Sequence, residues 1–253
     1  MIVLVRGHFD TDPRERLTFL TDRIPLSRLS AGGLAVVWAE ENSRDSLFEA
    51  MRRRETYATS GSRIVVRFFG GWQLPDALCE QPDLVEVGYR DGVPMGADLR
   101  LRTEGDGAPT FVLSALADPD GAGLGSLQLV KGWVEPSGQT REAVIDVVTA
   151  PPTGELDLAT CTPAEGARSL CATWTDPDFD PDSPAFYYVR VLEVPTCRWS
   201  QHVCVELGVD CDTLAAGDPL ALCCDEDGPP RSIEERAWTS PIWYGGAERP
   251  PAP

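Results

Sequence analysis

The hydrophobic pattern of the chain begins with one continuous apolar run. Residues 34–38, LAVVW, carry no polar side chain, which is typical of a strand that is buried on both faces, as in a parallel sheet. Such a strand needs neighbouring strands beside it and helices over both of its faces. The surrounding residues do not supply them, so the run predicts one edge of a larger β/α layer.

A helix is predicted directly after this run. Asn42 stands at the expected N-cap, and Asp45 stands near the position that receives a capping-box acid. Leu47, Phe48 and Met51 recur at helical spacing and form one apolar stripe. The pattern therefore predicts a buried strand followed by a helix with one apolar face.

From Arg63 onward the hydrophobic period changes to two. The segment RIVVRFF places Ile64, Val66 and Phe68 on one face of a predicted strand. Further segments of this kind follow between turns rich in glycine, proline and aspartate: LVEVGYR, PTFVLSAL, SLQLVKGWV, EAVIDVV and AFYYVRVLEV. Many short strands with such punctuation predict a mainly β fold, an antiparallel β-sandwich.

The change of period predicts two parts. With the boundary near the Gly-Gly-Trp of residues 70–72, residues 1–70 form a β/α part and residues 71–253 form a sandwich that contains cysteines. The first part holds 11 basic and 9 acidic side chains, and the second holds the remaining 11 basic and 31 acidic ones. The final GGAERPPAP is expected to be a disordered tail.

The charge of the chain limits its partners. The sequence has 22 Lys and Arg against 40 Asp and Glu, a formal net charge of −18 at pH 7. An excess of negative charge repels the phosphate backbone that a nucleic-acid-binding protein has to neutralise. We therefore expect neither DNA nor RNA to be a main partner.

Two features of the sequence disagree about its cellular compartment. No apolar run is long enough to cross a membrane, and the opening MIVLVRGHFD is interrupted by an arginine, so it does not form a signal peptide. Eight cysteines, however, are unusual for a reducing cytosol and favour disulfides or metal ligation. This combination predicts that the true N-terminus is missing from the sequence.

Several long strings identify a family. They are GGLAVVWAEENSRDSLFEAMRRRETYATSG, RIVVRFFGGW, LQLVKGW, WTDPDFDP with FYYVRVLE, CRWS, and ERAWTSPIWY. In this order and over residues 32–244, they closely resemble the C-terminal portion of the bacterial domain-of-unknown-function family 3604. That family is similar to the polymerase-and-histidinol-phosphatase (PHP) superfamily of metal-dependent phosphoesterases, which are built on a distorted β/α barrel.

The resemblance implies that residues 1–70 are the C-terminal remnant of such a barrel. Family members are typically longer than this chain and often exported, which implies a periplasmic or cell-envelope location for the parent protein. The family's Ser-Asp-Thr-His type metal segment would lie upstream of the stretch GHFDTDPRERL, which this chain enters at Gly7. The resemblance thus implies a divalent metal and a small-molecule substrate in the full-length parent only, and a chain that is inactive alone.

The histidines and possible nucleophiles of the sequence do not form a recognisable catalytic motif. A binuclear hydrolytic centre uses several His, Asp or Glu ligands, and the chain has only His8 and His202. We expect His8 to lie after the lost metal segment and His202 to be a solvated loop residue. A Ser-His-acid triad has no candidate, and the GAGLG of residues 121–125 is expected to be a hairpin turn. We expect no catalytic, cofactor-binding or metal-binding residue in this chain.

Two acidic segments have alternative interpretations. Glu40 and Glu41 follow the apolar run, so one of them could act as an acid or base in an intact barrel, or both could simply complement the dipole of the next helix. The turn DPDFDPDS, residues 176–183, alternates carboxylates as calcium loops do, but it lacks the glycine and distal glutamate of an EF-hand. A capped, solvated turn is the other interpretation and the one we favour.

The cysteines favour disulfides over zinc, because no C-x-x-C spacing is present. Cys161 and Cys171 bracket a hairpin-sized loop, and we expect them to pair, with a stabilisation of about 3 kcal/mol. A further five cysteines, which crowd one irregular segment, require a partner from elsewhere, such as Cys79, or leave one free thiol: Cys197, Cys204, Cys211, Cys223 and Cys224.

Aromatic side chains of the sandwich have two interpretations. They could form a carbohydrate platform, but the alternation of the strands places most of them on core faces, which is the interpretation we favour. They include Trp133, Trp174, Tyr187, Trp238 and Trp243.

Two functions of different classes follow. The chain is expected to be the C-terminal fragment of a PHP-like metal-dependent hydrolase, with a sandwich that shapes the barrel mouth or clamps substrate. The alternative is a non-catalytic binding or structural module of the cell envelope.

Overall fold

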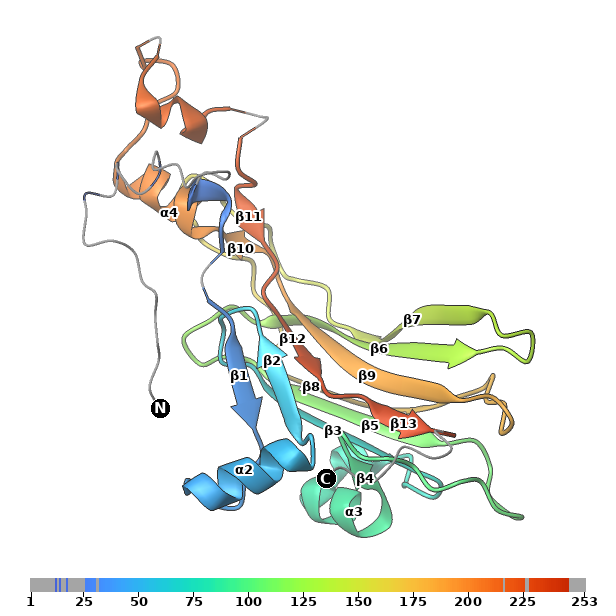
Figure 1. Cartoon of the computed structure of the whole chain (residues 1–253). Helices are drawn as coiled ribbons and strands as arrows, with labels where there is room; N and C mark the ends of the chain where they lie inside the picture. Colours follow the sequence, from blue (N-terminus) through green and yellow to red (C-terminus); the bar gives the residue numbers. More distant parts are fainter. Residues whose placement is uncertain are drawn as a thin grey trace.

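The structure, a computed structural model, describes residues 12, 14, 17, 26–30, 32–215, 217–225 and 228–245. These residues form two main antiparallel sheets that lie face to face, a short two-stranded ribbon, and a small lobe beyond that ribbon (Figure 1). All pairings between the named strands of these residues are antiparallel.

The larger sheet has seven strands and draws them from both ends of the chain. Their order is β1 (Leu34–Val37), β2 (Thr56–Thr59), β12 (Arg236–Thr239), β9 (Ala185–Glu193), β6 (Leu124–Val134) and β7 (Thr140–Thr149), with β13 (Ile242–Tyr244) also paired to β9. The second sheet has four strands in the order β4 (Val93–Pro94), β3 (Val65–Gly71), β5 (Thr110–Leu116) and β8 (Ser169–Thr175).

Helices stand outside the two sheets. They are α2 (Arg44–Arg52), α3 (Leu84–Asp91), α4 (Trp199–Glu206) and the 3-10 helices η1 (Leu26–Arg28), η2 (Leu78–Glu80) and η3 (Pro219–Cys223). The ribbon pairs β10 (Thr196–Cys197) with β11 (Ser232–Ile233). Within the described residues, no helix has the length and apolar character needed to span a bilayer.

The core lies between the two sheets. Ile64, Val66 and Phe68 are buried together, as the alternation of RIVVRFF predicts, and Phe68 stacks on Phe111 of β5. The larger sheet contributes Tyr187, Leu127, Leu129, Val189, Val191 and Ala237 to the same cluster. The prediction of a mainly β, sandwich-like fold is confirmed.

The prediction of a strand at LVEVGYR is wrong. These residues form α3, in which Val87 and Gly88 are buried. A Cβ on Gly88 would lie 2.6 Å from the ring of Phe69, so the glycine lets the helix pack closely on β3. Apolar residues at positions 84, 85 and 87 fit a short strand and a short helix equally well, and tertiary packing decides between them.

The predicted parallel strand at residues 34–38 is also wrong. β1 is the edge strand of the larger sheet and pairs antiparallel with β2, Leu34 opposite Thr59. Its residues are half-buried or exposed, because the sheet packs on one of its faces only. A short apolar run therefore stands at an edge here and does not need the second covered face of a parallel sheet.

Helix α2 confirms the predicted helix with two differences. Its N-cap is Ser43, whose hydroxyl accepts from the Ser46 N–H, and not Asn42. The predicted apolar stripe does not face a core, because Phe48 is 54% and Met51 52% exposed and the buried residue of the helix is Ala50.

Two further predictions concern chain connections. The boundary at residues 70–72 falls at the end of β3, and β2 on one side of it pairs with β12 on the other. The division of a parent protein into barrel and sandwich stays a prediction. The glycine-rich residues 121–125 lead from the connection after β5 of the smaller sheet into β6 of the larger sheet, which begins at Leu124; β5 and β6 do not pair, so the predicted hairpin turn is wrong.

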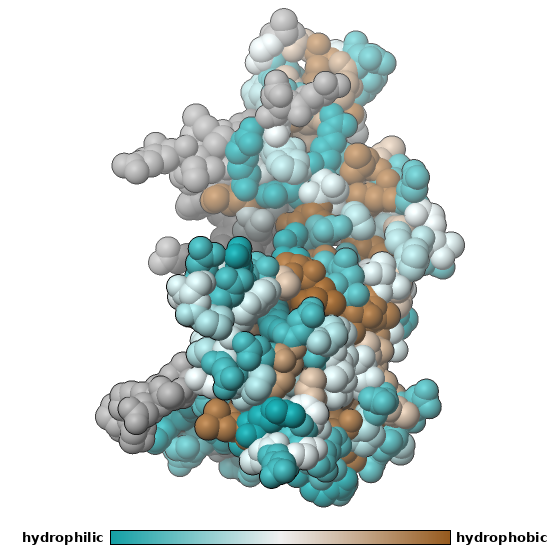
Figure 2. All heavy atoms as spheres, turned by 90° about the vertical axis from the view of Figure 1, so that its right-hand side faces the viewer, coloured by the Kyte–Doolittle hydropathy of each residue, from teal (hydrophilic) through white to brown (hydrophobic). Residues whose placement is uncertain are grey.

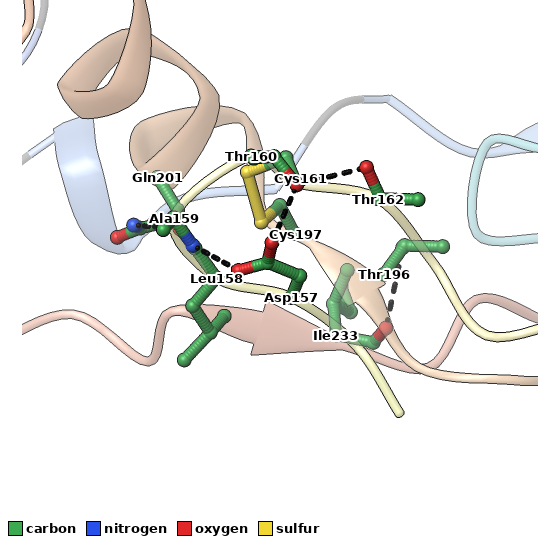
Figure 3. The surroundings of a disulfide bond; sticks show 10 residues. All are labelled: Asp157, Leu158, Ala159, Thr160, Cys161, Thr162, Thr196, Cys197, Gln201 and Ile233. Carbon is green, nitrogen blue, oxygen red and sulfur yellow. Dashed lines mark hydrogen bonds between the residues drawn. A yellow bond between two sulfur atoms is a disulfide. The ribbon is translucent and has the colours of Figure 1, made fainter. Parts of the chain in front are cut away.

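Four disulfides join all eight cysteines. The predicted Cys161–Cys171 pair is wrong, since Cys171 pairs with Cys79 and Cys161 with Cys197. Cys171 lies on β8 of the smaller sheet and pairs with Cys79 of the 3-10 helix η2, whereas Cys161 lies in a loop at the base of α4 (Figure 3). Proximity in sequence did not predict these pairs, because both cysteines find partners from other elements.

The remaining cysteines form a separate disulfide lobe, which we define as residues 196–233. Cys204 of α4 pairs with Cys223 of η3, and Cys211 pairs with Cys224. The prediction of disulfides in this irregular segment is confirmed. Figure 1 shows the lobe projecting beyond the sandwich, connected through β10 and β11.

Candidate functional site

A cleft of about 520 Å³ opens where β1 ends and α3 passes the sheets. It is lined by Trp38, Ala39, Glu40, Arg53, Glu55, Arg67 and Tyr89. Of the two glutamates singled out in the sequence, Glu40 lines this cleft, and Glu41 is exposed beside it. The cleft therefore contains one of the predicted candidates, together with side chains that the sequence pattern did not indicate.

Four elements position the side chains of the cleft. Trp38 follows β1, and its indole N–H donates to the Val66 carbonyl at 3.0 Å, which fixes the ring against β3. Glu55 precedes β2, Arg67 lies on β3, and Tyr89 lies on the last turn of α3. Residues that are distant in sequence thus meet at one edge of the sandwich.

Arg67 is held between two aromatic side chains. Its guanidinium carbon lies 3.2 Å from the centre of the Trp38 ring, a cation–π arrangement. Its Nη1 donates to the Tyr89 hydroxyl at 3.1 Å. A guanidinium carries five N–H donors, and a group held in this way loses little further freedom when it binds an oxygen ligand.

Glu55 is a buried carboxylate whose charge is balanced by neighbouring donors. Only 3% of the residue is exposed, and it accepts a hydrogen bond from the Tyr89 hydroxyl and lies 3.4 Å from Nη2 of Arg53. Burial, and then the hydrogen bond to Glu55, raise the pKa of Tyr89 above its usual value. Tyr89 therefore remains a neutral donor near neutral pH.

The cleft can bind a ligand, but its lining contains no pair of a nucleophile and a base. Two arginines, Arg53 and Arg67, supply donors, while the Tyr89 hydroxyl and the buried Glu55 carboxylate are engaged with each other. No nucleophile with an adjacent base lines the cleft. Guanidinium groups of this kind recognise planar or tetrahedral oxyanions such as carboxylate and phosphate.

Sequence reasoning missed Arg67 and Tyr89 for different reasons. The alternation of RIVVRFF puts Arg67 on the face opposite Ile64, Val66 and Phe68, and that position alone indicates no partner. Tyr89 was assigned to a strand, so its place on a helix beside Glu55 could not be foreseen. No local signal brings these two residues together, because 22 residues and a change of element separate them.

The other predicted candidates lie apart from the cleft. His8 and the tail after residue 245 lie outside the described residues, and His202 is exposed on α4, in a helix and not in a loop. The Asp-rich turn is capped as predicted, since Asp176 accepts from the Asp178 N–H and Asp180 accepts from the Ser183 hydroxyl. It is not solvated throughout, because Asp176 is buried and paired with Lys131. Among the described residues, no group of three or more His, Cys, Asp or Glu side chains is arranged to hold a metal ion.

Most of the predicted core aromatics are confirmed. Tyr187 is fully buried, and Trp133 and Trp174 pack against the core. Trp238 is partly buried and alternates with the buried Ala237 and Thr239, so it lies on the outer face of the larger sheet.

The sequence profile of the family described as "Protein of unknown function (DUF3604)" matches residues 10–246. This chain belongs to that family. No curated protein and no solved structure matches it. Family membership confirms the resemblance of the long sequence strings, and the family's description assigns no activity.

Proposed function

We propose that this chain is the β-sandwich portion of a metal-dependent hydrolase of the phosphoesterase class, and that its cleft binds the anionic part of the substrate. The resemblance of the family to PHP-type phosphoesterases supports the class. Arg67, presented between Trp38 and Tyr89, carries the proposal, because it offers preoriented donors to phosphoryl oxygens. The cleft lies beside the C-terminal ends of β1 and α2.

A divalent metal does not fit the residues of this cleft. Glu55 is engaged by Tyr89 and Arg53, which leaves Glu40 as the remaining acidic ligand in the lining. The proposal therefore places the metal centre in a part of the parent protein outside this sequence, and it assigns no catalytic step to this chain.

Binding of inorganic phosphate tests the role of Arg67. Titration of the disulfide-intact chain, followed by calorimetry, should show saturable binding that Arg67→Gln weakens roughly tenfold, the loss of one charge-assisted contact. Arg52→Gln is the matched control, because Arg52 is exposed on α2 with a long 3.9 Å contact to Glu49. Equal affinity of both variants would refute the assignment of the cleft.

A turnover assay tests the location of the catalytic centre. With Mg²⁺, Mn²⁺ or Zn²⁺ and p-nitrophenyl phosphate, this chain should release no nitrophenol. A metal-dependent rate that chelator abolishes would overturn the proposal. Translation of the DNA upstream of Met1 gives an independent test, since a His- and Asp-rich barrel sequence is expected there.

The second candidate is a non-catalytic binding or structural module of the cell envelope, and the disulfides are compatible with both candidates because they bear on the compartment alone. Four disulfides indicate an oxidising compartment, which we propose to be the periplasm or cell envelope. A promoter and a signal peptide upstream, in place of a barrel, would support this candidate over the hydrolase.

A further inference from the structure

A second pocket lies at the end of the sandwich where β6 turns into β7, at the right in Figure 1. Its volume is about 90 Å³, and its lining includes Lys131, Trp133, Glu135, Asp180 and Tyr187. Three waters fill about that volume at roughly 30 Å³ each, so the pocket admits one edge of a small molecule. This end of the sandwich faces the viewer in Figure 2, where hydrophilic and hydrophobic patches alternate.

The floor of the pocket carries a buried ion pair. Lys131, the single lysine of the sequence, is 7% exposed, and its Nζ lies 2.6 Å from Oδ2 of Asp176. The ammonium also donates to the Asp178 carbonyl at 3.0 Å, and Asp176 accepts from the Tyr187 hydroxyl at 2.7 Å. An ammonium has three donors, and these two contacts leave the third for an acceptor in the pocket.

The walls combine an aromatic ring with carboxylates. Nζ of Lys131 lies 5.2 Å from the centre of the Trp133 ring, which is partly exposed. Asp180 accepts from the Asp182 N–H and the Ser183 hydroxyl, and Glu135 accepts from Arg141. Each carboxylate has about four acceptor positions, so both can accept further hydrogen bonds from a ligand.

These groups select a ligand by charge. An anion would be attracted by Lys131 but repelled by Glu135, Asp180 and the buried Asp176, and a cation would be repelled by the ammonium. A hydroxyl group meets both requirements, because it accepts from an ammonium and donates to a carboxylate. Carbon-bound hydrogens beside such hydroxyls would pack on the indole of Trp133.

We propose that this pocket binds the edge of a neutral sugar, as the terminal residue of a glycan presents it. Two neighbouring hydroxyl groups would contact Lys131 and the carboxylates, and one face of the ring would lie on Trp133. The site is separate from the cleft that contains Arg67 and does not depend on the function proposed for that cleft.

Titration of the disulfide-intact chain with D-glucose, D-galactose and D-mannose tests the proposal, with the indole N–H resonance of Trp133 as the readout. At least one sugar should give a saturable shift with a Kd on the order of millimolar. D-glucuronate and D-glucosamine, which carry opposite charges, should each bind roughly tenfold more weakly than the best neutral sugar. No saturable shift with any neutral sugar, or tighter binding of a charged one, would overturn the proposal.

Two variants assign the binding to this pocket. Trp133→Leu, followed by calorimetry, should abolish sugar binding, whereas Trp238→Leu, a partly buried tryptophan of β12, should leave it unchanged. Asp180→Asn lies in an exposed turn and tests the carboxylate without disturbing the core; a loss of affinity of roughly tenfold is expected. Unchanged affinity in both Trp133→Leu and Asp180→Asn would contradict the assignment.

Discussion

The sandwich and the disulfide lobe are stabilised by different means. Among the described residues, the main core of the sandwich buries 21 hydrophobic residues between two sheets, whereas the cluster at the lobe buries four: Cys204, Leu220 and Cys223 of the lobe, and Leu17 from outside it. Half of that smaller set is one disulfide. A segment that buries so little apolar surface cannot offset its conformational entropy by packing, so covalent links restrict its unfolded state instead.

A mutation should therefore act over a different range in each region. In the sandwich, a core side chain should affect the whole fold, because both sheets share one cluster. In the lobe, a lost disulfide should act locally. Substitutions in each region test this difference.

The largest effect is expected for Phe111→Ala. Phe111 is fully buried, and the centre of its ring lies 4.3 Å from that of Tyr187 and 5.8 Å from that of Phe68. The cavity left behind should lower the free energy of unfolding of the sandwich by about 3–5 kcal/mol. Urea unfolding followed by tryptophan fluorescence measures this loss, and a change below about 1 kcal/mol would contradict the shared core.

The double variant Cys204→Ala with Cys223→Ala comes second. This disulfide joins cysteines that are 19 residues apart in sequence. Its loss should lower the free energy of unfolding of the lobe by about 3 kcal/mol, because the unfolded lobe gains loop entropy. Hydrogen exchange in α4 should rise while the strands β5 and β6 keep their protection. Loss of protection in those strands as well would mean that the lobe and the sandwich unfold as one unit.

A pH effect of intermediate size is expected from Glu193. The residue is 3% exposed at the end of β9, and burial, with smaller contributions from Glu235 and Asp118, raises its pKa to about 7. Ser62 and Arg168 act in the opposite direction. Protonation is thus more favourable in the folded state than in the unfolded state, so stability is greatest below the ordinary pKa and is lost as pH rises toward and through 7.

Glu193→Gln should remove this dependence. After allowance for solvent screening, the wild type should lose roughly 1–2 kcal/mol relative to the variant between pH 5 and pH 8. Unfolding free energies at both pH values measure the difference. Parallel pH profiles of the two proteins would exclude Glu193 as the titrating group.

The smallest effect is expected for Phe48→Ala on α2. The side chain is 54% exposed, so its truncation should change the unfolding free energy by less than about 0.5 kcal/mol. This variant is the matched control for Phe111→Ala, since both remove the same atoms. A loss comparable to that of Phe111→Ala would show that the described surface of α2 is covered in solution.

Much of the fold could be predicted because local pattern and tertiary packing agree there. The alternation in RIVVRFF and AFYYVRVLEV identifies strands with one buried face, and both form them. Prediction failed for LVEVGYR, where the same apolar residues fit two periods and contact with Phe69 favours the helix. It failed for the Cys161–Cys171 pair, because sequence separation does not indicate which strands lie together.

The mainly β class, the negative net charge, the abundance of disulfides and the family could all be read from the amino-acid sequence. These properties follow from composition, from hydrophobic period and from long sequence strings. Tertiary contacts are needed to see that β1 is an edge strand, which cysteines pair, and that Arg67, Tyr89 and Glu55 meet in one cleft. The physical reason is that such contacts join residues far apart in the chain, and their positions depend on how the two sheets pack.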